Sequence, residues 1–308
     1  MAEKMLESRV AVVTGAGRGI GRGVALLLAA EGARVVVNDY GVKGDGTEPS
    51  SEPANEVVEE IRKAGGEAVA VADTVATMDG AKRIVGTALE RFGKIDILVT
   101  CAGFLRDRMI FNMSEDDFDS VLGVHLKGTF ACVRAAVGPM REAGFGRIIT
   151  FTSGAGLFGN PGQSNYGSAK SAIAGFTKVI ARDLGKYGIT ANAVSPVAGT
   201  RMTLTDAYFK AREIRKQQGI VREDRGVGEI ETLSPDDVAP MVAFLASDAA
   251  ANVNGQVFLC TGPIYSLVSA PRPLSTIYKD GRWTVDELLE TIPNSLMLGV
   301  ANPAPTRE

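Results

Sequence analysis

The sequence predicts an α/β fold, a parallel β-sheet that is doubly wound with helices on both faces. Three observations predict it: short apolar segments alternate with helical segments along most of the chain, a glycine-rich turn joins the first strand to the first helix, and small residues follow later strands. With 308 residues, 45% of them hydrophobic, the chain can fill one large core. We expect a single domain over residues 1–262 and a C-terminal extension, residues 263–308, packed on that domain or on a neighbouring subunit.

The composition argues against several classes of function. A net charge of −3 gives no general attraction to nucleic acid or to an anionic membrane. No apolar run approaches the roughly 18 residues of a membrane span, and the N-terminus lacks the apolar block of a signal peptide. We therefore expect a cytoplasmic protein with no nucleic-acid or membrane partner.

The cysteines and the histidine limit the possible chemistry. The three cysteines, Cys101, Cys132 and Cys260, are far apart and form no C-x-x-C, so neither a disulfide framework nor a thiolate zinc site is expected. The single histidine, His125, cannot form a site that needs two imidazoles, and a Ser-His-Asp hydrolase would depend on it alone. We predict no metal centre.

A glycine-rich turn follows the first predicted strand, residues 9–14, and leads into a helix over residues 20–31. Such a turn exposes backbone N–H groups at the positive end of a helix, where a diphosphate can bind. The spacing is T-G-x-x-x-G-x-G, and taken alone it fits a purely structural turn equally well. The residues expected to contact a dinucleotide here are Gly15, Arg18, Gly19, Ile20 and Gly21.

An acidic residue at the end of the second strand strengthens the case for a dinucleotide. This strand, residues 33–38, is followed by Asp39, which is placed to accept hydrogen bonds from the adenosine ribose hydroxyls. Its charge would repel a 2′-phosphate and favour NAD over NADP. Arg18 argues for NADP, but an arginine can swing out to water whereas a carboxylate beneath the ribose acts at short range, so we expect NAD.

The alternation of elements continues to the fourth strand. A polar surface loop is predicted over residues 41–53, helices over 54–64 and 79–92, and strands over 67–72 and 95–99. Asp73, which follows the third strand, could meet the adenine amino group or cap the turn. Ala102 and Gly103, after the fourth strand, are small enough to let the backbone approach a cofactor.

The next helix carries the histidine on its apolar face. It begins at a capping box that starts with Ser114 and places Phe118, Val121, Leu122 and His125 at i, i+3, i+4 and i+7. A lone histidine on such a face is more often a hydrogen-bonded core residue than a catalyst. A catalytic role for His125 is the alternative.

The middle of the chain concentrates the predicted chemistry. A buried strand over residues 148–152 ends at Ser153, and a small-residue helix over residues 165–186 carries Tyr166 and Lys170. Residues four apart lie one above the other on a helix, so the ammonium can sit near the phenol. At about 4 Å and an effective dielectric constant of about 20, it would favour the phenolate by roughly 4 kcal/mol, about three pKa units. Ser153 could hold a substrate oxygen while the phenol exchanges its proton.

The alternative is that this tyrosine and lysine are an ordinary exposed helix pair. Of the six tyrosines, however, only Tyr166 has a lysine at +4 and follows a strand that ends in a serine. We therefore favour the catalytic interpretation.

The last part of the domain completes the predicted pocket. A sixth strand is expected over residues 189–194 and a last strand over residues 256–260. The residues expected at the nicotinamide end of the pocket are Pro196, Gly199 and Thr200. Residues 201–233 are predicted to form a mobile lid or, as an alternative, a static hairpin of surface helices.

The sequence resembles the short-chain dehydrogenase/reductase family over residues 8–262. The motifs that carry the resemblance are Thr14-Gly15-x-x-x-Gly19-x-Gly21, Ala102-Gly103, Ser153, Tyr166-x-x-x-Lys170 and the Pro196/Gly199 loop. The resemblance implies a Rossmann-type sheet of seven strands, a homodimer or homotetramer, and hydride exchange between a nicotinamide and a carbonyl or alcohol. It also implies that Tyr166 is the acid/base, that Lys170 lowers its pKa and holds the nicotinamide ribose, and that Ser153 positions the substrate oxygen.

Within the family the sequence most resembles the (3R)-hydroxyacyl-CoA dehydrogenase part of peroxisomal multifunctional enzymes and their bacterial relatives. The segments VVVNDYG, AGFLRDR, VHLKGTF, SPVAGTRMT and YKDGRWTVDEL carry this similarity. His125 stands where most family members have an asparagine that holds a water in a proton relay, and histidine recurs there in this subgroup. The resemblance therefore adds His125 to the candidate catalytic residues. Thr100-Cys101 replaces two asparagines, which puts in doubt only the hydrogen bonds of those side chains.

The leading hypothesis is an NAD-linked oxidoreductase that interconverts a secondary alcohol and a ketone, with a 3-hydroxyacyl thioester as the preferred substrate. A free cyclic or terpenoid alcohol is the alternative substrate, and a non-catalytic NAD-binding scaffold or sensor is the alternative of another class. A CoA thioester would need a basic patch at the mouth of the pocket. Arg106, Arg108 and Arg201 are candidates for it, although isolated arginines are commonly solvated surface charges.

Overall fold

Eight strands form one sheet in the order β3-β2-β1-β4-β5-β6-β7-β8. This computed structural model describes residues 4–42, 49–200, 202–205, 209–210, 213, 229–300 and 302. The strands are β1 (Val10–Thr14), β2 (Arg34–Asn38), β3 (Ala68–Val71), β4 (Ile97–Thr100), β5 (Gly146–Phe151), β6 (Ile189–Val197), β7 (Val257–Thr261) and β8 (Ile264–Leu267). The first seven are parallel, and β8 is antiparallel to β7. The predicted doubly wound α/β fold is confirmed.

The predicted number of seven strands is wrong by one. β8 follows β7 after only two residues, Gly262 and Pro263, and pairs back onto it with Thr261 opposite Ile264. Gly262 has a φ of +53°, which glycine adopts readily and which permits this tight reversal. The strand was missed because Pro263 is typical of a loop and because all four strand residues are exposed, so the apolar pattern of the parallel strands is lacking. The compact unit therefore extends to Val268.

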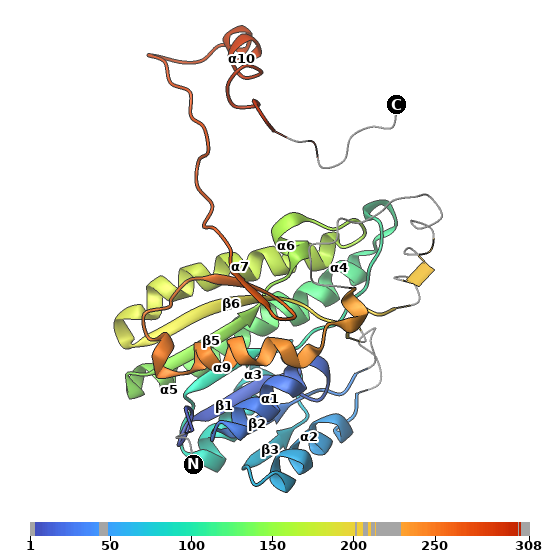
Figure 1. The fold of residues 1–308 in the computed structure, drawn as a ribbon, viewed down its shortest axis with the longest axis vertical. Coiled ribbons are helices and arrows are strands. Elements are labelled where there is room, and N and C mark those ends of the chain that lie inside the picture. The colour runs from blue at the N-terminus through green and yellow to red at the C-terminus, as the bar shows by residue number, and fades with distance from the viewer. Residues whose placement is uncertain are drawn as a thin grey trace. The chain divides into compact units, whose positions relative to one another are not determined.

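Helices cover both faces of the sheet, and α1 and α9 run side by side on one of them (Figure 1). The helices of the described residues are α1 (Gly19–Ala30), α2 (Glu52–Lys63), α3 (Met78–Phe92), α4 (Glu115–Leu122), α5 (Gly128–Ala143), α6 (Gly154–Phe158), α7 (Ser164–Leu184), α9 (Ala239–Ala246) and, in the extension, α10 (Val285–Thr291). On one face, α1, α2 and α9 bury side chains such as Leu28, Ile61 and Val242. On the other, α3, α5 and α7 bury side chains such as Ile84, Met140 and Ile180. The sheet is covered on both faces, which explains its continuous apolar strands.

The strand order places a crevice at the carboxyl ends of the central strands. β1 pairs with β2 on one side and with β4 on the other, so the chain winds outward in both directions from this point. In open parallel sheets, ligands bind outside the carboxyl ends of the strands at such a switch point. The glycine turn after β1, the small-residue turn after β4 and Ser153 after β5 all lie at this edge.

At the opposite, amino-terminal edge, paired charges surround Phe145. The guanidinium carbons of Arg9 and Arg147 lie 3.7 and 4.2 Å from the centroid of its ring. The buried Arg147 donates hydrogen bonds to three backbone carbonyls, and Arg9 donates to both carboxylate oxygens of Asp248 at 2.9 and 3.1 Å. Asp96, also buried, accepts from the Val10 N–H at 2.8 Å. This edge therefore satisfies its buried charges within the chain.

One continuous helical stretch, Glu115–Ala143, is long and apolar enough by length and composition to cross a membrane. It comprises α4, a π-helical segment (Gly123–Lys127) and α5. Within α5, Ala131, Ala136 and Met140 are fully buried in the core formed with α3 and β5. The apolar character of this stretch follows from its place in the core of the α/β unit.

The extension, Ser269–Glu308, forms a second unit. Its helix α10 begins at a capping box in which the Thr284 hydroxyl accepts from the Glu287 N–H. Lys279 donates to both carboxylate oxygens of Glu287 at 2.5 and 2.7 Å and lies 5.6 Å from the centroid of the Trp283 ring. The extension thus contains a short capped helix, and the surface on which the extension packs stays a prediction.

Candidate active site

The predicted serine, tyrosine and lysine lie together at the end of β5. Ser153 is the N-cap of α6, where its Oγ accepts from the Ala155 N–H at 3.2 Å and is also hydrogen-bonded to the phenol of Tyr166. Lys170 lies on the same face of α7 as Tyr166, with Nζ 5.5 Å from the centroid of the phenol ring. This ammonium is buried and donates to the Phe151 carbonyl at 2.7 Å. The three groups that sequence reasoning brought together are thus adjacent in space.

Close backbone contact between α6 and α7 makes this arrangement possible. A Cβ at Gly156 would lie 2.5 Å from the Ser171 backbone nitrogen, so only glycine fits at that position. The small residues of α7 thus allow α6, which carries Ser153 at its start, to lie directly against the helix of Tyr166.

The predicted lowering of the pKa of Tyr166 is wrong for this structure. Burial raises the pKa of the phenol to about 12, and the hydrogen bond from Ser153 opposes that rise. Burial also lowers the pKa of Lys170 to about 8. The simple two-charge argument failed because it placed the ammonium at about 4 Å and left out the cost of burying a phenolate. Tyr166 is therefore a protonated phenol at neutral pH.

His125 is both a buried core residue and a neighbour of the tyrosine. It belongs to the π-helical segment, and its ring packs edge-on against Tyr166 at a centroid distance of 5.1 Å and an angle of 82°. Its Nε2 lies 2.8 Å from the Phe104 carbonyl, to which the Nε2–H tautomer donates, and Nδ1 is a buried acceptor without a hydrogen-bond partner among the described residues. Burial, together with the charge of Lys170, lowers the pKa of the imidazole to about 3. His125 is therefore neutral.

Gly103 is fixed by this imidazole. A Cβ at Gly103 would lie 2.0 Å from the Cε1 atom of His125, so any side chain here would displace the ring. The glycine was predicted to allow close approach of a cofactor, and the structure shows a second reason for it. The histidine and the glycine form one structural unit beside Tyr166.

The glycine turn after β1 is tightly packed against the turn after β4. Gly15 has a φ of +65°, and a Cβ there would lie 2.6 Å from the Cα of Ala102. A Cβ at Gly21 would lie 2.1 Å from the Gly15 carbonyl oxygen, so the first turn of α1 sits directly on the loop. Arg18 is the N-cap of α1, and its side chain makes no capping hydrogen bond. The positive end of α1 thus faces the crevice, as a diphosphate site requires.

Asp39 is tied to the glycine turn. Its Oδ2 accepts from the Gly17 N–H at 2.8 Å, and its Oδ1 accepts from the Gly41 N–H at 2.6 Å. A Cβ at Gly17 would lie 2.8 Å from Oδ2, so Gly17, which sequence reasoning did not select, is needed for this contact. Arg18 reaches the Val42 carbonyl at 3.5 Å. The carboxylate is therefore fixed beside the glycine turn at the carboxyl edge of the sheet.

Comparisons with known proteins agree with this geometry. A family model described as enoyl-(acyl carrier protein) reductase matches residues 15–262. The chain is 41% identical over 300 residues to hydroxyacyl-CoA dehydrogenase ChsB1 of Mycobacterium tuberculosis, which covers 93% of this chain and 88% of that protein. It is 43% identical over 246 residues to peroxisomal multifunctional enzyme type 2 of Drosophila melanogaster. The aligned region covers 79% of this chain and 37% of that protein. The crystal structure of a short-chain dehydrogenase from Mycobacterium avium matches with a TM-score of 0.80 at 42% identity, covering 97% of each chain.

The chain belongs to the short-chain dehydrogenase/reductase family. The predicted family and its hydroxyacyl-CoA dehydrogenase relatives are confirmed, and the chain is an oxidoreductase that acts on CH–OH groups with a nicotinamide cofactor.

In this short-chain dehydrogenase/reductase, Asp73 is held by an arginine. Both oxygens of its carboxylate accept from Arg83, and Oδ1 also accepts from the Thr74 N–H at 2.9 Å. The hydrogen bond from Arg83 keeps the pKa of Asp73 below its usual value. The structure thus shows the turn-capping role that was one of the two predicted; contact with adenine stays a prediction.

The loop after β6 reaches the glycine turn. The methyl carbon of Thr200 lies 3.7 Å from where a Cβ of Gly19 would be. The Gly199 N–H donates to the Leu233 carbonyl at 2.8 Å. Pro196 and Val197 are the last two residues of β6 that pair with β7. Most of the predicted lid, residues 201–233, lies outside the described residues.

The two described arginines of the predicted basic patch lie beside acidic side chains. Arg106 forms an ion pair with Asp116 at 2.5 Å. Arg108 lies near the carboxylates of Asp107 and Asp117. Burial raises the pKa of Asp107, and the charge of Arg108 opposes that rise. A hydrogen bond with the Ser114 side chain lowers the pKa of Asp117, and Arg108 adds to that lowering. Arg201 lies outside the described residues. In this structure, Arg106 and Arg108 therefore interact with acidic side chains of the same chain.

Two residues that sequence reasoning missed fix the helix that carries Tyr166. Asn165 is fully buried, and its Nδ2 donates to the carbonyls of Arg106 and Asp117, both at 2.9 Å. Gln163 is the N-cap of α7, and its Nε2 donates to the Asp107 carboxylate at 2.8 Å. The available signal was a pair of amide side chains immediately before the tyrosine, but their partners lie some 50 residues away in the chain.

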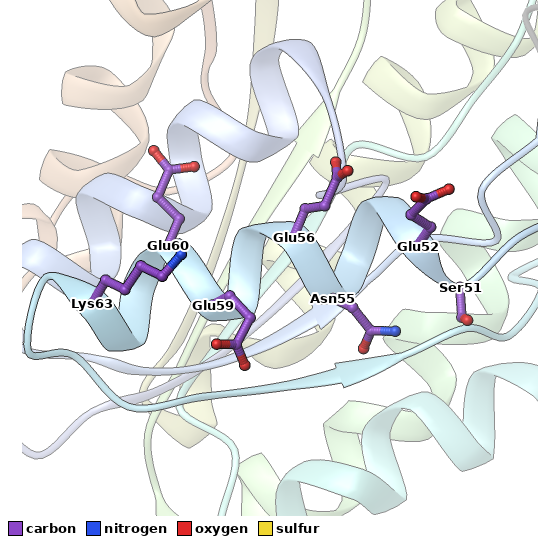
Figure 2. A pocket seen from close by; sticks show the side chains of 7 residues that line it. All are labelled: Ser51, Glu52, Asn55, Glu56, Glu59, Glu60 and Lys63. Atoms are coloured by element: carbon purple, nitrogen blue, oxygen red, sulfur yellow. The ribbon is translucent and has the colours of Figure 1, made fainter.

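A separate pocket lies along the solvent-facing side of α2 (Figure 2). It is lined by Ser51, Glu52, Asn55, Glu56, Glu59, Glu60 and Lys63. Glu60 accepts from Arg22 of α1 at 2.7 Å, so part of this acidic surface is paired. None of the predicted site residues lines the pocket, and we assign it no part in the chemistry.

Proposed function

We propose that this protein is an NAD-linked dehydrogenase/reductase that interconverts a 3-hydroxyacyl thioester and the corresponding 3-oxoacyl thioester. The observation that carries the proposal is the cluster of Ser153, Tyr166 and Lys170 beside the glycine turn at the carboxyl edge of the sheet. The thioester class is supported by the similarity to hydroxyacyl-CoA dehydrogenase ChsB1 along most of the chain.

The residues of the crevice fit a dinucleotide. The glycine turn brings backbone N–H groups and the start of α1 to one point, which suits a diphosphate. Asp39 is fixed where it would accept ribose hydroxyls and repel a 2′-phosphate, which supports NAD. The residues that would hold the cofactor are Gly15, Arg18, Gly19, Ile20, Gly21, Asp39, Asp73, Ala102, Gly103, Tyr166, Lys170, Pro196, Gly199 and Thr200.

The proposed chemistry assigns one role to each polar group. When bound, the nicotinamide supplies or takes up the hydride. Ser153 donates a hydrogen bond to the substrate oxygen, and Tyr166 gives its proton to that oxygen during reduction or removes the proton during oxidation. The buried ammonium of Lys170 stabilises the phenolate form. With a pKa of about 12, the phenol holds its proton at neutral pH and is ready for the reductive direction.

His125 has a positioning role in this proposal. It is neutral, packs edge-on against Tyr166 and offers the bare acceptor Nδ1 to a donor. An imidazole with a pKa of about 3 does not carry a proton at neutral pH, so we assign it orientation of the phenol.

The experiment that tests the function compares cofactors and substrates. We expect the purified protein to bind NADH at least about tenfold more tightly than NADPH, because one unfavourable charge contact costs about 1.4 kcal/mol or more. We also expect it to reduce acetoacetyl-CoA with NADH more efficiently than free cyclic ketones. Efficient turnover of the cyclic ketones with none of the thioester would reject the substrate assignment, and cofactor binding without any turnover would reject the catalytic one.

We further propose a homodimer or homotetramer. Phe130 of α5 and Val179 of α7 expose 45% and 56% of their surface, and Phe130 forms a ring pair with Phe176 at 6.4 Å. Apolar side chains exposed on two adjacent helices support subunit packing there. Light scattering at several protein concentrations tests this: a monomer at all concentrations would contradict it.

A reducing compartment such as the cytoplasm fits the cysteines. Cys101, Cys132 and Cys260 are all free thiols. Burial raises the pKa of each to about 12, so little reactive thiolate forms. These observations support the proposed cytoplasmic location, which imaging of the tagged protein would test.

A further inference from the structure

The segment between β4 and α4 is fastened to the start of α7 by hydrogen bonds. The Arg108 N–H donates to the Gly162 carbonyl at 2.8 Å, and Asn165 donates to the Arg106 carbonyl at 2.9 Å. Between these two backbone contacts, the side chain of Gln163 donates to Asp107 at 2.8 Å. The carboxylate of Asp107 is therefore held in place by contacts on both sides of it.

This fixed carboxylate stands close to the reacting phenol. Gln163 is the N-cap of α7, and its carbonyl accepts from the Gly167 N–H in the first turn, which also contains Tyr166. Asp107 is thus bonded to the residue that stands three positions before Tyr166 in the chain. The two groups interact electrostatically, since the charge of Asp107 contributes to the raised pKa of Tyr166.

The positive groups considered around this carboxylate are an arginine and a buried lysine. Arg108 lies near Asp107, and Lys170 is buried with its ammonium bonded to the Phe151 carbonyl. His125 is neutral, and Asp107 itself is exposed to solvent. Of these two charges, the carboxylate of Asp107 is therefore the one exposed to solvent, and the ammonium of Lys170 is the buried one.

We propose that Asp107, held by Gln163 at the mouth of the site, is a specificity-determining residue that disfavours substrates with a free carboxylate beside the reacting carbon. The inference rests on the proposed function, which it deepens. A free 3-hydroxy acid carries its carboxylate two carbon–carbon bonds from the carbinol carbon, whereas a thioester or ester of the same acid is neutral at that position. Asp107 thus selects the esterified form by repelling the charged one.

The test is the ratio of two specificity constants. For each variant, kcat/KM is measured for ethyl 3-hydroxybutyrate, which is the neutral substrate of the ratio, and for free 3-hydroxybutyrate, which is the charged one. The CoA thioester, whose charges lie on the distant CoA phosphates, is measured separately. We expect Asp107→Asn to lower the ratio of kcat/KM for the neutral substrate to kcat/KM for the charged one by roughly three- to tenfold. This is the size expected when one repulsive charge pair in a partly solvated site is removed. Asp107→Glu should keep the ratio of the wild type. The amide of asparagine can still accept from Gln163, so the segment keeps its fastening.

The matched control is Asp119→Asn. Asp119 is an exposed carboxylate on α4, and its substitution changes the net charge by the same amount. We expect no change in the ratio there. The effect at Asp107 should also shrink in about 0.5 M salt, because screening weakens a charge repulsion but not a packing defect.

The outcomes separate this inference from the proposed function. An unchanged ratio in Asp107→Asn, or an equal fall in Asp119→Asn, would overturn the role of Asp107. Turnover of the ethyl ester but not of the thioester by the wild type would reject the thioester assignment, while the ester-to-acid ratio would still decide the role of Asp107. Wild-type inactivity on all three compounds would overturn both.

Discussion

The two edges of the sheet differ in how their charged and titratable side chains are paired. At the amino edge, Arg9 and Arg147 stack near Phe145, and their guanidinium groups bond to carbonyls and carboxylates of the chain. At the carboxyl edge, the half-buried Tyr166 and the buried Lys170 have pKa values of about 12 and about 8. The first edge contributes stability. The second keeps groups whose protonation is perturbed by burial, as is typical of a functional site.

The two edges also differ in their buried polar atoms that lack a hydrogen-bond partner. The buried side-chain atoms without a hydrogen-bond partner among the described residues are Nδ1 of His125 and Oγ of Ser195, and Ser195 lies on β6 near its carboxyl end. A buried acceptor without a partner costs stability. Both such atoms lie toward the carboxyl edge of the sheet, and within the described part of the chain none lies at the edge around Phe145.

The largest effect should follow the removal of one hydroxyl at the carboxyl edge. We predict that Tyr166→Phe lowers kcat by about 10²- to 10⁴-fold, because proton transfer by a positioned group contributes a factor of that size. The melting temperature and the affinity for NADH should stay near the wild-type values, since the ring remains. Stopped-flow or steady-state rates measure the loss. Activity near wild type would remove the acid/base role from Tyr166.

The largest effect at the amino edge should be on stability. We predict that Arg147→Ala lowers the free energy of unfolding by about 2–4 kcal/mol, because three backbone carbonyls and an ion pair lose a buried partner. Urea unfolding measures the change, and kcat of the folded protein should be unaffected. Arg182→Ala, at an exposed arginine of α7, is the matched control and should be nearly neutral. A loss of kcat without a loss of stability would contradict the division between the edges.

The sequence allowed most of the fold and the positions of the site residues to be predicted. Parallel strands bring their carboxyl ends to one edge, so Gly15, Asp39 and Ser153, each placed by a local pattern at a strand end, had to meet there. Tyr166 and Lys170 followed from helical spacing. These are short-range or topological rules, and they need no knowledge of burial.

What escaped prediction depends on burial and on contacts between distant segments. The sign of the pKa shift at Tyr166 is set by desolvation, which a sequence does not give. The contact of Gly103 with His125 and the hydrogen bond from Gln163 to Asp107 join residues 22 and 56 positions apart. β8 was missed because an exposed strand has no apolar pattern.

The perturbed protonation at the carboxyl edge should appear in the pH dependence. Oxidation requires the phenolate, whose fraction rises about tenfold per pH unit below a pKa of about 12, so kcat/KM for oxidation should rise steeply from pH 6 to pH 8. Above about pH 8 the slope should fall, because Lys170 loses its proton and no longer stabilises the phenolate. Reduction uses the protonated phenol and should be nearly independent of pH over this range.

Initial rates in both directions across pH 6–10 check this. His125, with a pKa of about 3, should contribute no inflection near pH 6.5. An oxidation profile that levels off by pH 7 would show that the working enzyme lowers the phenol pKa far below the value set by burial.

The smallest effect should come from the surface that belongs to neither edge. Arg22 of α1 donates to both carboxylate oxygens of Glu60 on α2 at 2.7 Å, and the two side chains are 39% and 48% exposed. We predict that Glu60→Gln changes the free energy of unfolding by at most about 0.5 kcal/mol and leaves kcat unchanged, since exposed ion pairs are weakened by solvent and salt. Urea unfolding at two salt concentrations measures it. A change above about 1 kcal/mol, or altered NADH affinity, would mean that the contact between α1 and α2 supports the glycine turn, and that stability and function are not separated as the two edges suggest.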